Sequence, residues 1–123
     1  MNSPRHDYLR QVIDIYLWLP GTPRKASRRD RALARALYDR GVRLHDIRAA
    51  LLLVAARRVF RDPQATALPP VRTLYYFLPA LEEVHQERPE PDYLDYLTAK
   101  LRPLAEAKGR SGVDGRPENR AFS

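Results

Sequence analysis

The stretch AALLLVAA, Ala49 to Ala56, is a run of eight consecutive apolar residues that decides the fold of this 123-residue chain. Because an α-helix turns by about 100° per residue, a helix with this sequence is apolar on every side of its middle. Such a helix must be covered all round by neighbouring elements. The run therefore predicts a buried central helix with other helices packed around it.

Two further helices are expected before the central one. The first begins at Pro4 and ends at Pro20-Gly21, since proline suits a first helical turn and a Pro-Gly pair favours a chain turn. The second begins with Ser27 and Asp30, which resemble a capping box, and ends before Gly41, a natural left-handed stop. The second helix, the glycine turn and the central helix form the pattern of a helix-turn-helix. The apolar middle of the central helix argues against its use as a recognition helix in a DNA groove.

Prolines divide the second half of the chain. A loop is expected over residues 62–70, then a helix over 71–87 that Pro79 should kink or split, and a last helix over 92–107 that Pro103 should bend. The aromatic side chains that we expect in the core rather than on a stacking platform are Trp18, Tyr75, Tyr76 and Phe77. The last helix carries an apolar stripe at helical spacing, made by Tyr93, Leu97, Leu101 and Leu104.

These features predict an all-α fold, a compact bundle of about five helices around the apolar central helix, with a helix-turn-helix-like element. A single helical domain is expected over residues 1–107. Residues 108–123 are rich in glycine and charge, so a flexible C-terminal tail is expected there. The sequence has no cysteine and no apolar run near the roughly 20 residues of a membrane span, so we expect a soluble, cytoplasmic protein with no membrane partner.

Positive charge is concentrated in the first half of the chain. Residues 1–61 hold 14 Lys and Arg against 5 Asp and Glu, whereas residues 62–107 hold 4 against 8. A compositional bias explains why arginine outnumbers lysine 19 to 3, but not why the charge lies in one half. Since a basic surface attracts polyanions, nucleic acid is the leading partner.

The charge is densest where the second helix begins. A helix N-terminus already carries a partial positive charge, so cations there are unfavourable unless an anion such as phosphate is bound. At helical spacing Arg28, Arg31 and Arg35 fall within an arc of about 60° and form one ridge, here called the arginine ridge. Asp39, one turn beyond Arg35, should partly neutralise it. The residues expected to bind nucleic acid are Arg24, Lys25, Arg28, Arg29, Arg31 and Arg35, extended by Arg43 and Arg48 if the turn before the central helix faces the same way.

No catalytic constellation stands out in the sequence. Glu82-x-x-His85 is one metal-binding pair, whereas a di-iron bundle needs two such pairs and further glutamates. Glycine-rich phosphate loops and nucleophile motifs do not occur. We therefore expect a protein that is not an enzyme and that holds no metal and no cofactor. At the end of the central helix, Arg57, Arg58 and Arg61 fit a structural role, because the helix dipole favours cations there.

The segment from Leu37 to Val84 resembles a known family. It reads Tyr38-x-x-Gly41-Val42-x-Leu44-x-x-Ile47-x-x-Ala50-Leu51, then a proline-containing loop, then Arg72-Thr73-Leu74-Tyr75-Tyr76-Phe77. This pattern looks like the helical domain of DnaD-type replication and primosome proteins, in which an aromatic, an aliphatic and a Trp recur on one later helix. Phe77 and Leu81 match that helix, and Val84 stands where Trp is expected. The resemblance implies a nucleic-acid-binding accessory of replication or of a mobile element, with a helicase as partner.

Two functions follow as hypotheses. In the first, a non-catalytic accessory protein of replication, a mobile element or a ribonucleoprotein grips the phosphate backbone through the arginine ridge without reading sequence. In the second, an adaptor for a nucleic-acid enzyme binds a basic protein with its acidic C-terminal half, chiefly Glu82, Glu83 and Glu87, and an acidic protein with the ridge. An arginine surface that only keeps the protein soluble is the third alternative, and the sequence does not separate DNA from RNA.

Overall fold

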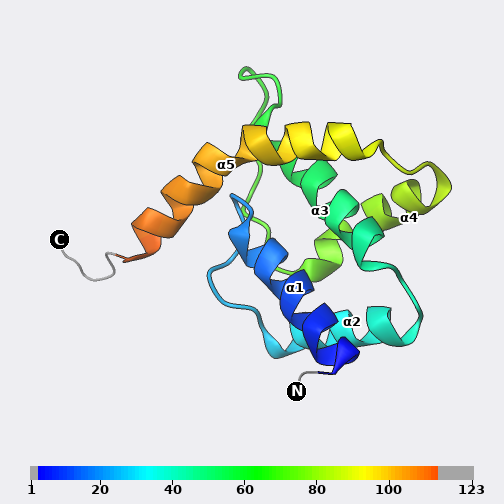
Figure 1. Cartoon of the computed structure of the whole chain (residues 1–123). Helices are drawn as coiled ribbons and strands as arrows, with labels where there is room; N and C mark the ends of the chain where they lie inside the picture. Colours follow the sequence, from blue (N-terminus) through cyan, green and yellow to red (C-terminus); the bar gives the residue numbers. More distant parts are fainter. Residues whose placement is uncertain (1–2, 114–123) are drawn as a thin grey trace.

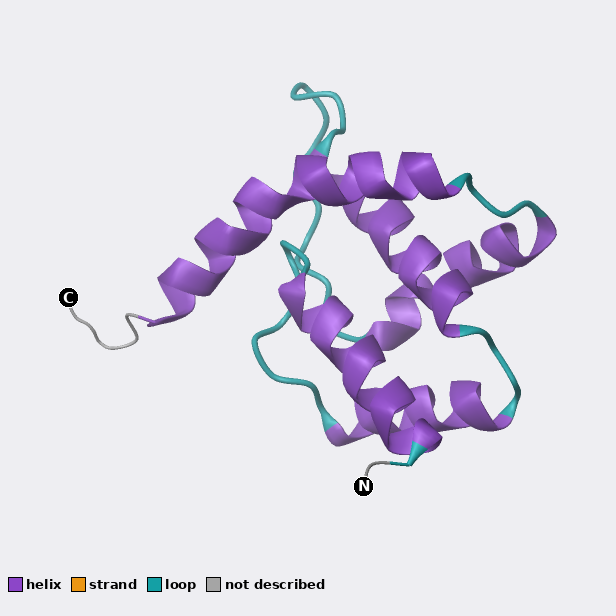
Figure 2. Cartoon of the chain, viewed as in Figure 1, coloured by secondary structure: helices purple, strands orange, loops and turns teal. Residues whose placement is uncertain are grey.

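The computed structural model describes residues 3–113, which form five α-helices and one 3₁₀-helix and contain no strand (Figures 1 and 2). In chain order the elements are α1 (Pro4–Trp18), α2 (Arg28–Asp39), α3 (Leu44–Val59), η1 (Leu74–Phe77), α4 (Leu78–Gln86) and α5 (Pro91–Val113). The prediction of an all-α fold is confirmed.

The apolar run forms the middle of α3, which is the central helix of the fold. Helix α3 contacts α1, η1, α4 and α5. Figure 1 shows it running between α1 and α4, with α5 across its C-terminal end. From Ala49 to Ala56 every residue is buried except Leu53 and Val54, which are half-buried. Burial on all sides leaves α3 no free face for a DNA groove, as its sequence predicts.

Helix α2 ends at a glycine turn of the expected kind. Gly41 has a φ of 78°, in the left-handed region that favours glycine. The N–H of Val42 donates to the carbonyl of Leu37 at 3.0 Å, and the N–H of Gly41 donates to that of Tyr38 at 2.9 Å. This pair of bonds is a Schellman motif, which satisfies the last carbonyls of α2. The chain then turns into α3, so the helix-turn-helix-like element is present.

Pro79 splits the helix expected over residues 71–87. It lies in the first turn of α4, where its missing N–H has no helical partner to lose. The preceding residues form the short η1, which begins with the Thr73 hydroxyl accepting the N–H of Tyr75 at 3.2 Å. The segment is therefore a 3₁₀ turn followed by an α-helix rather than one bent helix.

Helix α5 is longer than the sequence suggests. It continues to Val113, so the prediction of a flexible tail from residue 108 was wrong for residues 108–113. The rest of that expected tail, residues 114–123, lies outside the described residues. Figure 1 shows α5 bending partway along, and Pro103 lies inside it, in agreement with the expected bend.

The buried face of α5 also differs from the expected stripe. Tyr93 and Leu104 are 48% and 40% exposed. The side chains that α5 buries are instead Leu94, Leu97, Leu101 and Ala105. These four also recur at helical spacing, and with them turned inward the side chain of Tyr93 lies at the surface.

Lys108 attaches the far part of α5 to the end of α1. Its Nζ atom, with three N–H groups, lies within hydrogen-bonding distance of four oxygens: Leu17 O at 2.6 Å, Leu19 O at 2.8 Å, Thr22 Oγ1 at 2.7 Å and Pro23 O at 3.2 Å. A cation is favourable at a helix C-terminus, where carbonyls lack helical partners. Burial, together with the charge of Arg24, lowers the pKa of Lys108 to about 8, so the amine still carries its proton at neutral pH.

We expect Lys108→Met to lower the free energy of unfolding by about 1–3 kcal/mol, because the main-chain carbonyls at the end of α1 lose their donor. Urea denaturation followed by circular dichroism measures this. Lys25→Met is the control, since Lys25 is exposed and should change stability by less than about 0.5 kcal/mol. Equal effects of the two substitutions would contradict this role of Lys108.

Candidate nucleic-acid interface

Asp30 organises the start of α2 and joins it to η1. It forms the expected capping box: Ser27 Oγ accepts the N–H of Asp30, and Asp30 Oδ2 accepts the N–H of Ser27, both at 3.0 Å. The other oxygen, Oδ1, accepts the N–H of Leu74 at 2.9 Å and the Thr73 hydroxyl at 3.3 Å. Burial alone would raise the pKa of Asp30, but these hydrogen bonds outweigh it and the pKa is lowered.

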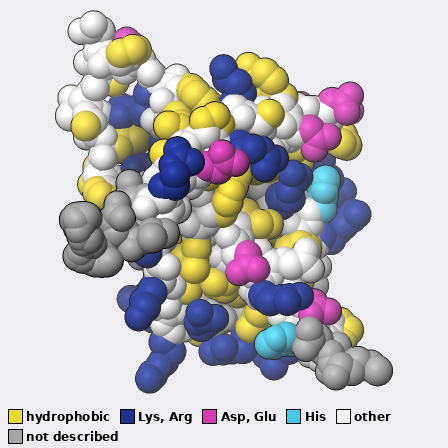
Figure 3. All heavy atoms as spheres, turned by 60° about the vertical axis from the view of Figure 1, so that its left-hand side comes forward, with side chains coloured by type: hydrophobic (Ala, Val, Ile, Leu, Met, Phe, Trp, Pro, Cys, Tyr) yellow, Lys and Arg dark blue, Asp and Glu magenta, His cyan; other side chains and the backbone are white. Residues whose placement is uncertain are grey.

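Because Asp30 is only 1% exposed, the single acid of the segment 24–35 faces inward and the cations face water. Arg28 and Arg31 of the arginine ridge are exposed and Arg35 is half-buried. The inner face of α2 is made by Asp30, Leu33, Ala34 and Leu37. Figure 3 shows Lys and Arg side chains gathered along the lower edge of the molecule, where α2 and the start of α1 lie.

The expected neutralisation of Arg35 by Asp39 was wrong. Asp39 Oδ2 instead accepts a hydrogen bond from Arg5 Nη2 of α1 at 3.4 Å. Helix α1 packs on α2, and this packing brings Arg5 within reach of Asp39. Both side chains are exposed, so the pair adds little stability. The arginine ridge therefore keeps its positive charge.

The two arginines expected to extend the footprint lie in different places. Arg43 is exposed at the start of α3, beyond the far end of α2. Arg48 is half-buried in a groove between α1, α3 and α5, where its Nη2 donates to Thr98 Oγ1 at 3.2 Å. No residue of α2 lines that groove. The structure thus groups Arg24, Lys25, Arg28, Arg29, Arg31 and Arg35 around the start of α2, and it does not bring Arg48 to them.

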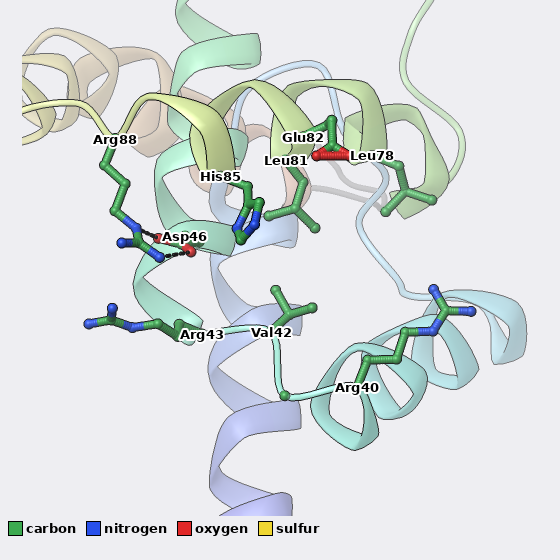
Figure 4. Close-up of a pocket in the computed structure, with 10 residues that line it drawn as sticks. Arg40, Val42, Arg43, Asp46, Leu78, Leu81, Glu82, His85 and Arg88 are labelled. Carbon is green, nitrogen blue, oxygen red and sulfur yellow. Dashed lines mark hydrogen bonds and ion pairs between the residues drawn. The ribbon is translucent and has the colours of Figure 1, made fainter.

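Arg43 lines a hollow of about 330 Å³ between the α2–α3 turn and α4 (Figure 4). Arg88 reaches across it to Asp46 in the first turn of α3, with distances of 2.9 and 3.1 Å to the two carboxylate oxygens. This pairing holds the pKa of Asp46 below its usual range. Since both oxygens of Asp46 are engaged, its carboxylate is not poised to act as a general base.

Tyr75 and Tyr76 are exposed, which corrects their assignment to the core. They are 41% and 44% exposed, whereas Phe77 is 4% exposed. Consecutive side chains of a 3₁₀-helix point about 120° apart, so only one of the three can face inward. Arg29 lies over the ring of Tyr75, with its Cζ atom 5.6 Å from the ring centroid. Trp18, also expected in the core, is half-buried.

The acidic residues expected to bind a protein partner lie along α4 and its end. Glu82, Glu83 and Glu87 are all exposed. Glu83 is engaged within the chain, because Arg57 donates to its two oxygens at 2.9 and 3.1 Å and lowers the pKa of its carboxyl.

The arginines that end α3 have structural partners. Arg58 donates to the carbonyl of Pro69 at 2.5 Å and to the hydroxyl of Tyr76 at 2.9 Å. Arg61 donates to the carbonyl of Thr66 at 2.7 Å. Together these bonds attach the loop before η1 to the end of α3.

Residues 3–113 hold neither a cluster of metal-binding side chains nor a helix that could span a membrane. No group of three or more His, Cys, Asp and Glu side chains is placed to hold a metal ion. None of the helices in this range is both long and apolar enough to span a bilayer.

Comparison with protein-family models, curated proteins and solved structures gave no match for this chain. The resemblance to DnaD-type domains therefore stays a prediction.

We expect Asp30→Asn to lower the free energy of unfolding by about 1–3 kcal/mol at neutral pH, since the amide cannot accept from all the donors that the carboxylate satisfies. The folded-state pKa of Asp30 lies below the ordinary 3.8, so its contribution to stability is present above pH 3.8 and is lost as pH falls through the folded value. The difference between wild type and variant should shrink below pH 3.8 in urea titrations. A difference that stays constant down to pH 2.5 would contradict this role of the Asp30 carboxylate. Asp39→Asn is the control, because Asp39 is exposed.

Proposed function

We propose that this protein is a non-catalytic, cytoplasmic nucleic-acid-binding accessory protein that grips the phosphate backbone through the start of α2. The observation that carries the proposal is the inward placement of Asp30, which leaves six Lys and Arg side chains of residues 24–35 before α2 and along its first turns. Phosphate is an anion suited to this place, because arginine side chains bind it through paired N–H groups.

The geometry favours contact with the backbone rather than with base edges. The arginine ridge lies along one outer face of α2, and the helix that follows the turn is buried through its middle. Contacts of this kind position a protein on nucleic acid without reading its sequence. The setting proposed is replication, a mobile element or a ribonucleoprotein, in line with the resemblance to DnaD-type domains.

A second candidate is an adaptor that binds a helicase or another nucleic-acid enzyme. It is favoured by the exposed acidic residues around the connection from α4 to α5, namely Glu87, Glu90, Asp92 and Asp95. The two candidates are compatible, since the arginine ridge and this acidic surface lie on different elements. A complex that survives nuclease and high salt would support the adaptor.

We expect Arg28→Ala, Arg31→Ala and Arg35→Ala together to weaken binding to oligonucleotides. Six phosphate contacts predict a log-log salt slope of about −5 on duplex DNA, and loss of three contacts predicts about −3. Fluorescence anisotropy measures both slopes. The titrations run between roughly 50 and 200 mM salt, where such contacts change the affinity strongly.

The matched control also removes three positive charges, but from α1 and α5 instead of the ridge. Its substitutions are Arg10→Ala, Arg102→Ala and Arg110→Ala. This control should keep the slope of the wild type. The proposal fails if binding does not depend on salt, or if the ridge variant and the control behave alike.

A further inference from the structure

Five aromatic side chains, here called the aromatic belt, are 41–55% exposed: Phe60, Tyr75, Tyr76, Tyr93 and Tyr96. They come from three places in the chain, the end of α3, η1 and the start of α5. Exposure of this much aromatic surface is unfavourable in water unless something covers it. The belt is therefore a candidate binding surface, separate from the arginine ridge.

A cation lies over three of the five rings. Arg29 lies 5.6 Å from the ring centroid of Tyr75, Arg58 lies 5.2 Å from that of Tyr76, and Lys100 Nζ lies 5.4 Å from that of Phe60. The remaining two rings, Tyr93 and Tyr96, stack on each other with centroids 6.3 Å apart. Three rings of the belt thus have a cation against them, and the other two have each other.

The belt is continuous from η1 to α5. A groove of about 460 Å³ is lined by Tyr76, Arg57 and Arg58, and a second of about 590 Å³ is lined by Arg57 and by Phe60, Tyr93 and Tyr96. Since Arg57 borders both grooves, they adjoin. At the other end, Arg29 of α2 connects the belt to the arginine ridge. The aromatic belt therefore lies next to the arginine ridge at Arg29 and Tyr75.

The chemistry of this surface selects its ligand. Aromatic rings offer flat faces for stacking, and the positive charge near them attracts phosphate. Arg57 and Arg58 supply such charge while they also hold Glu83 and the carbonyl of Pro69. The grooves and the ring of Tyr75 are lined by five cations, Arg29, Arg57, Arg58, Arg61 and Lys100, and by one acid, Glu83. Two further acids, Asp92 and Asp95, are exposed on α5 next to Tyr93 and Tyr96 in the sequence. Protein-binding surfaces are also rich in tyrosine and arginine, but lysine is depleted in them, and here Lys100 lies over the ring of Phe60. A duplex keeps its bases stacked inside, so the rings could not reach their faces.

We infer that the aromatic belt binds an unpaired nucleic-acid strand, whose bases stack on the belt while its phosphates contact the cations beside it. This inference rests on the proposed function and narrows its ligand from nucleic acid to single strands. DNA and RNA share the bases and phosphates concerned, so the experiment includes both. The arginine ridge contributes to binding of single strands and duplexes alike.

The test compares a labelled 20-nucleotide mixed-sequence strand with its duplex, as DNA and as RNA, by anisotropy at one stated salt concentration. We expect tighter binding of the single strand, and Tyr75→Ala with Tyr76→Ala should weaken that binding about tenfold or more while duplex binding changes less than twofold. Tyr93→Ala with Tyr96→Ala tests the other end of the belt in the same way. Leu104→Ala is the control, because it removes an exposed apolar side chain outside the belt.

The outcomes separate this inference from the proposed function. If wild type binds single strand and duplex equally and the tyrosine variants bind like wild type, the belt does not bind bases and the ridge proposal stands. If neither nucleic acid binds, the proposed function fails as well. Crosslinking with 5-iodouracil in the single strand gives an independent readout, and crosslinks on peptides that contain none of the belt residues would overturn the inference.

Discussion

The carboxylate of Asp30 is the interaction on which the candidate interface depends. One of its oxygens completes the capping box that begins α2, and the other accepts the main-chain N–H of Leu74, 44 residues further along the chain. The same side chain therefore fixes where the arginine ridge begins and where η1 lies beside it. Because Asp30 is buried, the negative charge that could neutralise the arginines is turned away from solvent. The Asp30 carboxylate thus determines both the position of η1 beside α2 and the positive charge of the surface around the arginine ridge.

The buried position of α3 explains why the candidate interface is where it is. A helix covered by α1, η1, α4 and α5 has only its ends free, so the surface functions fall to the elements packed around it. Helix α2 carries the exposed arginines proposed to bind phosphate, and η1 with the end of α3 and the start of α5 carries exposed aromatic rings. Arg29 is the residue where the two meet, since it belongs to α2 and lies over Tyr75.

Local signals in the sequence predicted most of the fold. The apolar run located α3, Ser27 located the start of α2, and Gly41 located its end, because each acts through neighbours within a few residues. Contacts between distant segments were not predictable in this way. Nothing in the sequence near Lys108 indicates its four partners in residues 17–23, and nothing near Asp30 indicates that it also accepts the N–H of Leu74. The exposure of the two tyrosines of η1 could have been inferred from Pro79, which marks the start of a new helix and so breaks the helical periodicity before it.

The most direct measurement is an amide ¹H–¹⁵N spectrum of the labelled protein titrated with a single-stranded oligonucleotide. We expect the shifts to concentrate at the start of α2, in η1, at the end of α3 and at the start of α5. Shifts confined to the hollow between Arg43 and Arg88, or the absence of shifts at residues 28–31 and 73–77 under conditions where binding occurs, would contradict this expectation.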